Sequence, residues 1–103
     1  MTNLLIDFRK SRRKGKKYEI ILMIDGKKKT FNFGSNVSKT FVEGATLEKR
    51  NNYLKRHSVN ENWNEINPGS LSAGILWGDS NDIQENLKDY MKEFNIKWNF
   101  IWQ

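Results

Sequence analysis

The feature that most constrains the fold is a mostly apolar segment, then a turn signal, then a segment with alternating side chains. Residues 18–24, YEIILMI, have the length and β-branched content of a buried strand. Asp25 and Gly26 follow, and this pair supplies the positive φ angles that tight hairpin turns require. In residues 29–35, phenylalanine alternates with polar residues, as in a returning strand. The sequence therefore predicts a β-hairpin over about 18–34.

The middle of the chain has helical spacing. It predicts a helix over about 46–57, with Thr46 as the N-cap and Glu48 in the first turn. At 100° per residue, Leu47 and Leu54 lie close together on the helix and define its expected buried side.

Two further helices and a terminal strand are predicted in the second half of the chain. Pro68 marks a break before a short helix over about 70–77. Ser80 is placed to cap a helix over about 80–94. In residues 96–103, IKWNFIWQ, every second side chain is apolar, which predicts a C-terminal strand.

Together these elements predict one α+β domain over residues 1–103, with a small antiparallel sheet built on the hairpin. A chain of this length is long enough for one small core and too short for two domains. Residues 3–8 are a candidate third strand. If they form one, the basic run at 9–17 is a loop joining two strands, and otherwise it is a mobile arm.

The composition excludes several kinds of site. The chain has no cysteine and a single histidine, which excludes disulfides, thiolate catalysis and cysteine-based zinc sites. We therefore expect no metal and no cofactor. No apolar run reaches the roughly 18 residues of a membrane helix, and the start MTNLLIDFRK lacks the order of a signal peptide. These features predict a protein that is not secreted and has no membrane partner.

No catalytic residue stands out. His57 has no nucleophile or metal site at a recognisable spacing, so we expect a protein that is not an enzyme. Glu19, Asp25 and Lys27 loosely resemble the carboxylate-lysine sites that nucleases build on hairpins, although their order and spacing differ from the usual form. A metal-dependent nuclease is therefore kept as a third hypothesis.

Charge is distributed unevenly along the chain. Residues 1–57 contain 15 basic and 5 acidic residues, whereas residues 58–103 contain 3 basic and 7 acidic residues. Such a basic half is suited to an anionic polymer, and a role in solubility is the alternative. The residues expected to contact nucleic acid are Arg9, Lys10, Arg12, Arg13, Lys14, Lys16, Lys17, Lys27, Lys28, Lys29, Lys49, Asn52, Lys55 and Arg56.

Other polar residues of the first helix are better placed to fix it to the rest of the fold. Arg50 and His57 lie at the edge of its expected buried side. Their candidate partners are a carboxylate such as Glu61 or a backbone carbonyl. Among the tryptophans, Trp77 is expected in the core, and Trp63 is left open between capping the end of the helix and exposure.

Residues 48–80 contain a distinctive string of basic, aromatic and small residues. Its members are Lys49, Arg50, Tyr53, Arg56, His57, Glu61, Trp63, Pro68, Ser72, Leu76 and Trp77. With the lysine-rich hairpin before it, this string resembles a family of small basic proteins of uncharacterised function from large nucleocytoplasmic DNA viruses (giant viruses). The resemblance implies a viral protein in the host cytoplasm or nucleus during infection, with packaging in the virion as a further expectation.

We therefore expect a non-enzymatic protein that binds the phosphate backbone of nucleic acid, DNA in preference to RNA, without strong sequence specificity. The alternative is a minor virion protein that docks on other virion proteins through the aromatic strand at 96–103. The run at 9–17 also fits a nuclear-localisation signal. The oligomeric state is left open.

Overall fold

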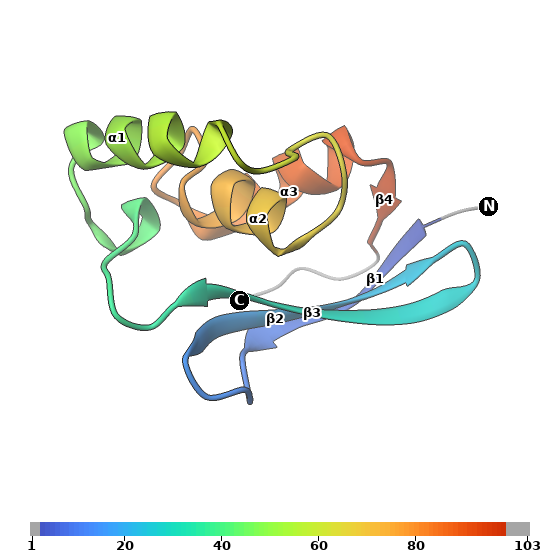
Figure 1. Ribbon diagram of the computed structural model, residues 1–103. Coiled ribbons are helices and arrows are strands. Elements are labelled where there is room, and N and C mark those ends of the chain that lie inside the picture. The colour runs from blue at the N-terminus through green and yellow to red at the C-terminus, as the bar shows by residue number, and fades with distance from the viewer. Residues whose placement is uncertain (1–2, 99–103) are drawn as a thin grey trace.

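Three strands, a group of helices and a short last strand make up the fold. The computed structural model describes residues 3–98. The strands are β1 (Asn3–Lys10), β2 (Lys16–Ile24), β3 (Lys27–Ser35) and β4 (Ile96–Lys97). The helical segments are the 3₁₀ turn η1 (Phe41–Glu43), α1 (Leu47–Ser58), α2 (Pro68–Leu71), the π-helical turn η2 (Ser72–Leu76) and α3 (Ile83–Glu93). The helices lie together on one face of a curled sheet, so the predicted α+β class is confirmed (Figure 1).

The sheet has the order β3-β2-β1-β4. The predicted hairpin is confirmed as β2 and β3, joined by Asp25 (φ 51°) and Gly26 (φ 80°). Residues 3–8 lie within β1, which pairs antiparallel with β2. β4 pairs in parallel with β1, so the fourth strand makes the sheet mixed, and the sequence pattern predicts no pairing direction for this strand. The helices between β1 and β4 form the crossover that parallel strands need.

The core lies between the sheet and the helices. Phe8, Ile20 and Phe33 come from the inner face of the three long strands, and their side chains are fully buried. Ile75 and Met91 meet them from η2 and α3. Aromatic burial supplies much of this core, as the composition suggests.

Helix α1 begins where the sequence places it, because the Thr46 side chain accepts a hydrogen bond from the Lys49 amide. Its buried side is only partly as predicted. Leu54 packs against the core as expected, but Leu47 is 59% exposed and Tyr53 packs against the core as well. The contacts that fix this rotation come from distant segments, which local spacing does not reveal.

The other helix starts differ from the predictions by two or three residues. Pro68 is the first residue of α2 and not a break before it, because Asn67 caps the helix and the first turn needs no amide from proline. Asp82, and not Ser80, caps α3, since its side chain accepts from the Gln84 amide.

The predicted C-terminal strand is seen only at its beginning. Ile96 is 2% exposed and belongs to the core, and Trp98 packs against the core. The remaining part of the predicted strand, 99–103, lies outside the described residues. Within residues 3–98, none of the helices combines the length and the apolar character needed to cross a bilayer.

Candidate nucleic-acid interface

The basic run at 9–17 forms an ordered connection between β1 and β2. The Ser11 amide donates to the Lys17 carbonyl at 3.0 Å and closes the loop. The Asn36 amide donates to the Gly15 carbonyl at 3.2 Å, which ties the loop to the segment after β3. The loop therefore holds its cations at a defined place on the surface.

Two arginines of this run are held by one buried carboxylate. The Glu19 side chain accepts from the Arg12 amide at 2.9 Å and from the Arg12 guanidinium at 3.1 Å. Arg9 lies opposite Glu19 in the β1–β2 register, and it contacts both Glu19 at 3.3 Å and Asp7 at 2.8 Å. The hydrogen bonds from Arg12, with a further one from Arg9, lower the pKa of Glu19 to about 2. The charges of Arg9 and Arg12 therefore stabilise the loop, and Glu19 already neutralises part of them.

A second carboxylate holds Lys17. Its Nζ lies 3.0 Å from Glu43, and only 10% of the lysine side chain is exposed. Glu43 also accepts from the amide and the hydroxyl of Thr40, each at 2.9 Å. Burial acts to raise the pKa of Glu43, but the hydrogen bonds from Thr40 and Lys17 outweigh it and the pKa is lowered. Lys17 therefore joins β2 to η1.

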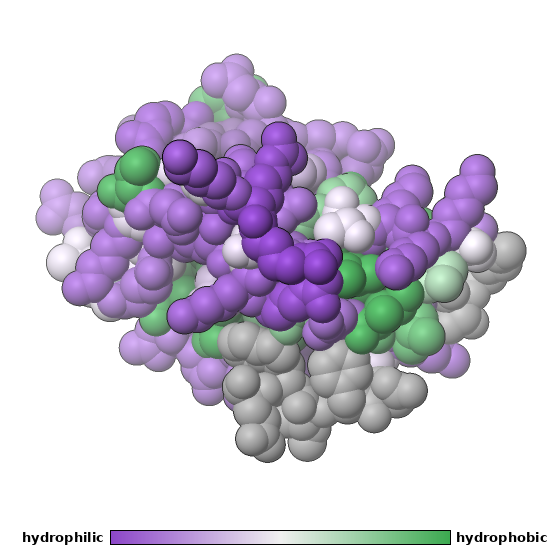
Figure 2. Space-filling view, turned by 90° about the horizontal axis from the view of Figure 1, so that it is seen from below, coloured by the Kyte–Doolittle hydropathy of each residue, from purple (hydrophilic) through white to green (hydrophobic). Residues whose placement is uncertain are grey.

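The remaining cations of the run point to solvent. Lys10, Arg13 and Lys14 are exposed, and none of them has an ion-pair partner among residues 3–98. Hydrophilic residues occupy much of the sheet's outer side, seen from below (Figure 2). We call Lys10, Arg13 and Lys14 the loop cations.

The lysines of the hairpin turn, Lys27–Lys29, form a separate patch. They are exposed, but the turn lies at the opposite end of β2 from the loop cations. Eight steps along a strand span about 26 Å. The structure thus divides the predicted phosphate contacts between two ends of the sheet.

Helix α1 presents the third predicted group to solvent. Lys49, Asn52, Lys55 and Arg56 are all exposed. No ion pair involves them within the described part of the chain. The charges of Lys49, Lys55 and Arg56 and the amide of Asn52 are therefore available for a ligand.

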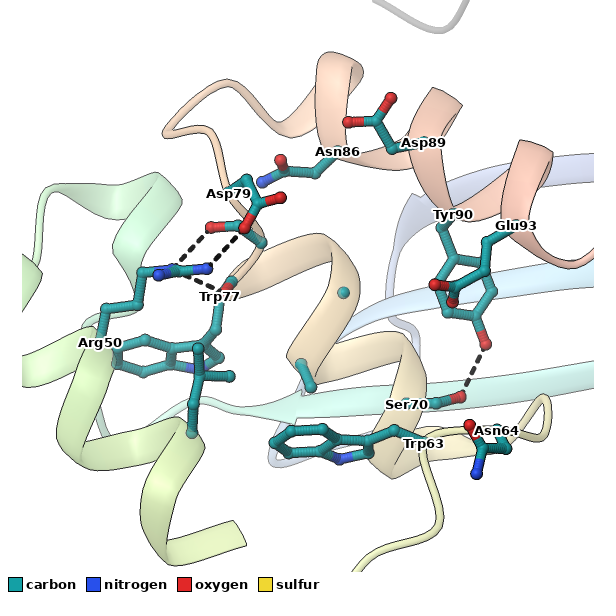
Figure 3. Close-up of a pocket in the computed structure, with 14 residues that line it drawn as sticks. Arg50, Trp63, Asn64, Ser70, Trp77, Asp79, Asn86, Asp89, Tyr90 and Glu93 are labelled. Carbon is teal, nitrogen blue, oxygen red and sulfur yellow. Dashed lines mark hydrogen bonds and ion pairs between the residues drawn. The ribbon is translucent and has the colours of Figure 1, made fainter. Parts of the chain in front are cut away.

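Arg50 joins the opposite side of α1 to the end of η2 (Figure 3). Its Nε donates to the carbonyl oxygens of Trp77 at 3.1 Å and Gly78 at 2.8 Å, and its Nη2 contacts Asp79 at 2.9 Å. The guanidinium also lies 5.5 Å from the centre of the Phe41 ring. Arg50 therefore contacts the backbone, in agreement with the kind of partner that the sequence suggests.

A stack of three rings joins α1 to η2. The ring of Tyr53 lies 4.3 Å from that of Trp77 and 4.1 Å from that of His57, with interplanar angles of 8° and 24°. One ring face has room for one neighbour at this distance, so Trp77 and His57 lie on opposite faces of Tyr53. The Tyr53 hydroxyl contacts Ser72 Oγ at 3.1 Å. Burial raises the pKa of Tyr53.

The loop after α1 is folded around Glu61. One carboxylate oxygen lies 2.6 Å from Nδ1 of His57, and the other accepts from Nε1 of Trp63 at 2.8 Å. Gly69 lies beneath, where an added Cβ would be 3.0 Å from the carboxylate. The string that carries the family resemblance is thus largely a network of contacts that positions α1.

These elements enclose a cleft of about 390 Å³ between the start of β2, the end of β3, α1 and the start of α2. Pockets of this size accept small ligands or parts of large ones. Its lining includes three cations, Lys16, Lys49 and Arg56, together with the rings of Tyr53 and His57. We call it the basic cleft. It brings together Lys16 and α1, which sequence reasoning treated as separate groups.

A second cleft of about 340 Å³ lies between η2, α3 and the loop after α1 (Figure 3). Its lining includes the carboxylates of Asp79, Asp89 and Glu93, and we call it the acidic cleft. Within it the Tyr90 hydroxyl contacts Ser70 Oγ at 2.7 Å, and burial raises the pKa of Tyr90 to about 12.

The residues of the nuclease hypothesis are not brought together. Glu19 lies in β2 and Asp25 in the turn after it, six positions further along the chain, a separation of about 20 Å at the rise of an extended strand. Glu19 is occupied by Arg9 and Arg12. Among residues 3–98 there is no cluster of three side chains suited to a metal ion.

A comparison with protein families gives a match to residues 6–57, which are half of the chain. The chain belongs to DUF5754, a family of unknown function. The DUF5754 match begins in β1 and ends in α1, and it includes every residue predicted to contact nucleic acid. Glu61 and Trp77 lie beyond it. Neither the curated proteins nor the solved structures in the comparison contain a match.

Sequence reasoning missed several contacts within this DUF5754 chain. In the sequence, Tyr53 stands out only as a member of the string at 48–80, yet it lies at the centre of the ring stack. The spacing of Tyr53 and His57, four residues apart on a helix, is the local signal that brings their rings together. No local signal predicts the contacts of Tyr53 with Ser72 and of Arg50 with Asp79, because the partners lie about 20 and 30 residues apart along the chain.

Proposed function

We propose that the protein binds nucleic acid by neutralising phosphates at the end of the molecule that contains the loop cations and the basic cleft. It does so without catalysis. One observation supports this most strongly: Lys16, which follows the loop, lines the same cleft as Lys49 and Arg56 of α1. Cations from two distant parts of the chain thus gather at one site.

The chemistry of this surface favours phosphate contact over base recognition. Lysine and arginine side chains that neutralise phosphates release condensed counterions, which gives affinity that falls steeply with salt and depends little on sequence. Arg9, Arg12 and Lys17 have internal partners. Their role in this proposal is to hold the loop in place.

We also propose a large DNA virus as the source, because of the resemblance carried by residues 48–80 and the lysine-rich hairpin before them. DNA is the expected polymer. The alternative function, docking through the terminal strand, receives less support, because Ile96 is buried in the core of this molecule and β4 pairs with its own β1.

The test is equilibrium binding to duplex DNA, single-stranded DNA and RNA across a salt series. A loop variant, Lys10→Ser with Arg13→Ser and Lys14→Ser, is compared with a turn variant, Lys27→Ser with Lys28→Ser and Lys29→Ser. Both variants lose three positive charges. We expect the loop variant to reduce the salt slope on duplex DNA by about 2 to 3, and the turn variant to reduce it much less.

Two outcomes contradict the proposal. Weak binding of the unaltered protein to all three polymers at about 0.15 M salt, near physiological ionic strength, would show that the basic surface has another role. Equal losses in the loop and turn variants would show that total charge matters and that the site does not.

A further inference from the structure

The ring stack at the basic cleft ends on a partly exposed ring. Trp77 is 3% exposed and is the inner end of the stack, and Tyr53 is covered on both faces. His57 is the outer end, and 32% of its side chain is exposed. Its second ring face has no ring neighbour among the described residues.

His57 is also held in a fixed orientation. Its Nδ1 lies 2.6 Å from Glu61, and Glu61 is itself fixed by Trp63. An aromatic ring that is held in this way is a preorganised surface, because little side-chain freedom is lost when a ligand stacks on it.

The surroundings of this ring suit a nucleotide. His57 lines the basic cleft with Lys16, Lys49 and Arg56, so a planar group on the ring would have cations close by. Aromatic side chains stack on unpaired bases in proteins that bind single strands, and neighbouring cations contact the phosphates. The volume of about 390 Å³ is large enough for a nucleobase.

We infer that the basic cleft takes one unstacked nucleobase of a single strand on the outer face of His57, with the flanking phosphates on Lys16, Lys49 and Arg56. This deepens the proposed function and rests on it. A duplex offers phosphates but keeps its bases stacked on one another. The protein therefore binds single strands, or unpaired ends, more tightly than duplexes of equal length.

The ligand that isolates the base contact is an oligonucleotide with the same phosphates and fewer bases. We would compare a single strand with the same strand containing a run of abasic sites, and a duplex as the third ligand. For the unaltered protein we expect the abasic strand to bind roughly tenfold more weakly than the intact strand, the effect of one stacked base. A fluorescent 2-aminopurine in the intact strand should also change its emission on binding.

The protein variants are His57→Ala, which removes the ring, and His57→Phe, which keeps a ring and removes the contact with Glu61. We expect His57→Ala to bind the intact strand about as weakly as it binds the abasic strand, so that the difference between these two ligands disappears. His57→Phe should retain most of the preference. A preference that survives in His57→Ala, or an emission of 2-aminopurine that the unaltered protein leaves unchanged, would overturn the inference. Failure to bind any polymer would instead overturn the proposed function.

Discussion

The two clefts share one wall and differ in the charge around them. Trp77 lines both, and Arg50 and Tyr53 of α1 pack on it from the first half of the chain. The basic cleft takes its cations from β2 and α1, whereas the acidic cleft takes its carboxylates from the segment after η2 and from α3. The basic first part of the chain and the acidic last part therefore meet at Trp77, which lines one cleft of each charge.

The two parts of the chain contribute different components to the fold. The DUF5754 match, residues 6–57, contributes the sheet and the basic helix. Residues after it supply most of the apolar helical layer that covers the sheet, together with the acidic rim. Neither half has a complete core alone, so the two clefts depend on the same packing.

The largest predicted effect follows from that shared packing. Trp77→Ala should lower the free energy of unfolding by about 3–5 kcal/mol, since it removes a buried aromatic ring from the core. Chemical denaturation would measure it. The matched control is Trp63→Ala, because Trp63 is half-buried and lines the acidic cleft but not the basic cleft, and a smaller loss is expected there. Equal losses would show that Trp77 is not the shared wall that the structure indicates.

Much of the basic side could be predicted from local pattern. Asp25-Gly26 defines the hairpin, and Thr46 the start of α1, because both signals act within a few residues. Once residues 3–8 are taken as a strand, antiparallel pairing puts the loop and the turn at opposite ends of β2. The register then sets Arg9 opposite Glu19.

Other features could not be predicted because distant partners decide them. The parallel pairing of β4 with β1 joins segments more than 90 residues apart. Leu47 is exposed because the contact of Tyr53 with Trp77 decides which side of α1 packs against the fold. The spacing of apolar residues within α1 does not reveal this contact. The charge pattern singled out the cations that line the basic cleft. It did not show that Lys16 and α1 share a cleft.

The two sides should also differ in how they respond to pH. On the basic side, the pKa of Glu19 is lowered from 4.5 to about 2 in the folded protein. Above pH 4.5 its full contribution to stability is present, and this is lost as the pH falls toward 2, where the unfolded chain binds the proton first. The free energy of unfolding should therefore fall more steeply below pH 4.5 in the unaltered protein than in Glu19→Gln.

On the acidic side, Tyr90 has a pKa raised from 10 to about 12, so the folded protein keeps its proton longer than the unfolded chain. Its contribution is complete below pH 10 and is lost as the pH rises toward 12. Tyr90→Phe should flatten the alkaline limb of the stability profile and leave the acid limb unchanged. Chemical denaturation of Glu19→Gln and Tyr90→Phe at acid and alkaline pH tests both predictions. If Glu19→Gln changed the alkaline limb, or Tyr90→Phe the acid limb, these two groups would not be the source of the pH dependence.

The smallest predicted effect concerns binding. Asp89→Ser with Glu93→Ser removes two negative charges from the acidic cleft and makes the protein more basic. We expect the affinity for single-stranded DNA to rise less than about threefold at 0.15 M salt, because these carboxylates line the acidic cleft and not the basic cleft, and salt screens exposed charges over a Debye length of about 8 Å. Binding titrations at that salt would measure it, with the loop variant as the contrast, since its three charges lie at the proposed site. A large rise would mean that the polymer also passes the acidic side, and the basic cleft would then be only part of the interface.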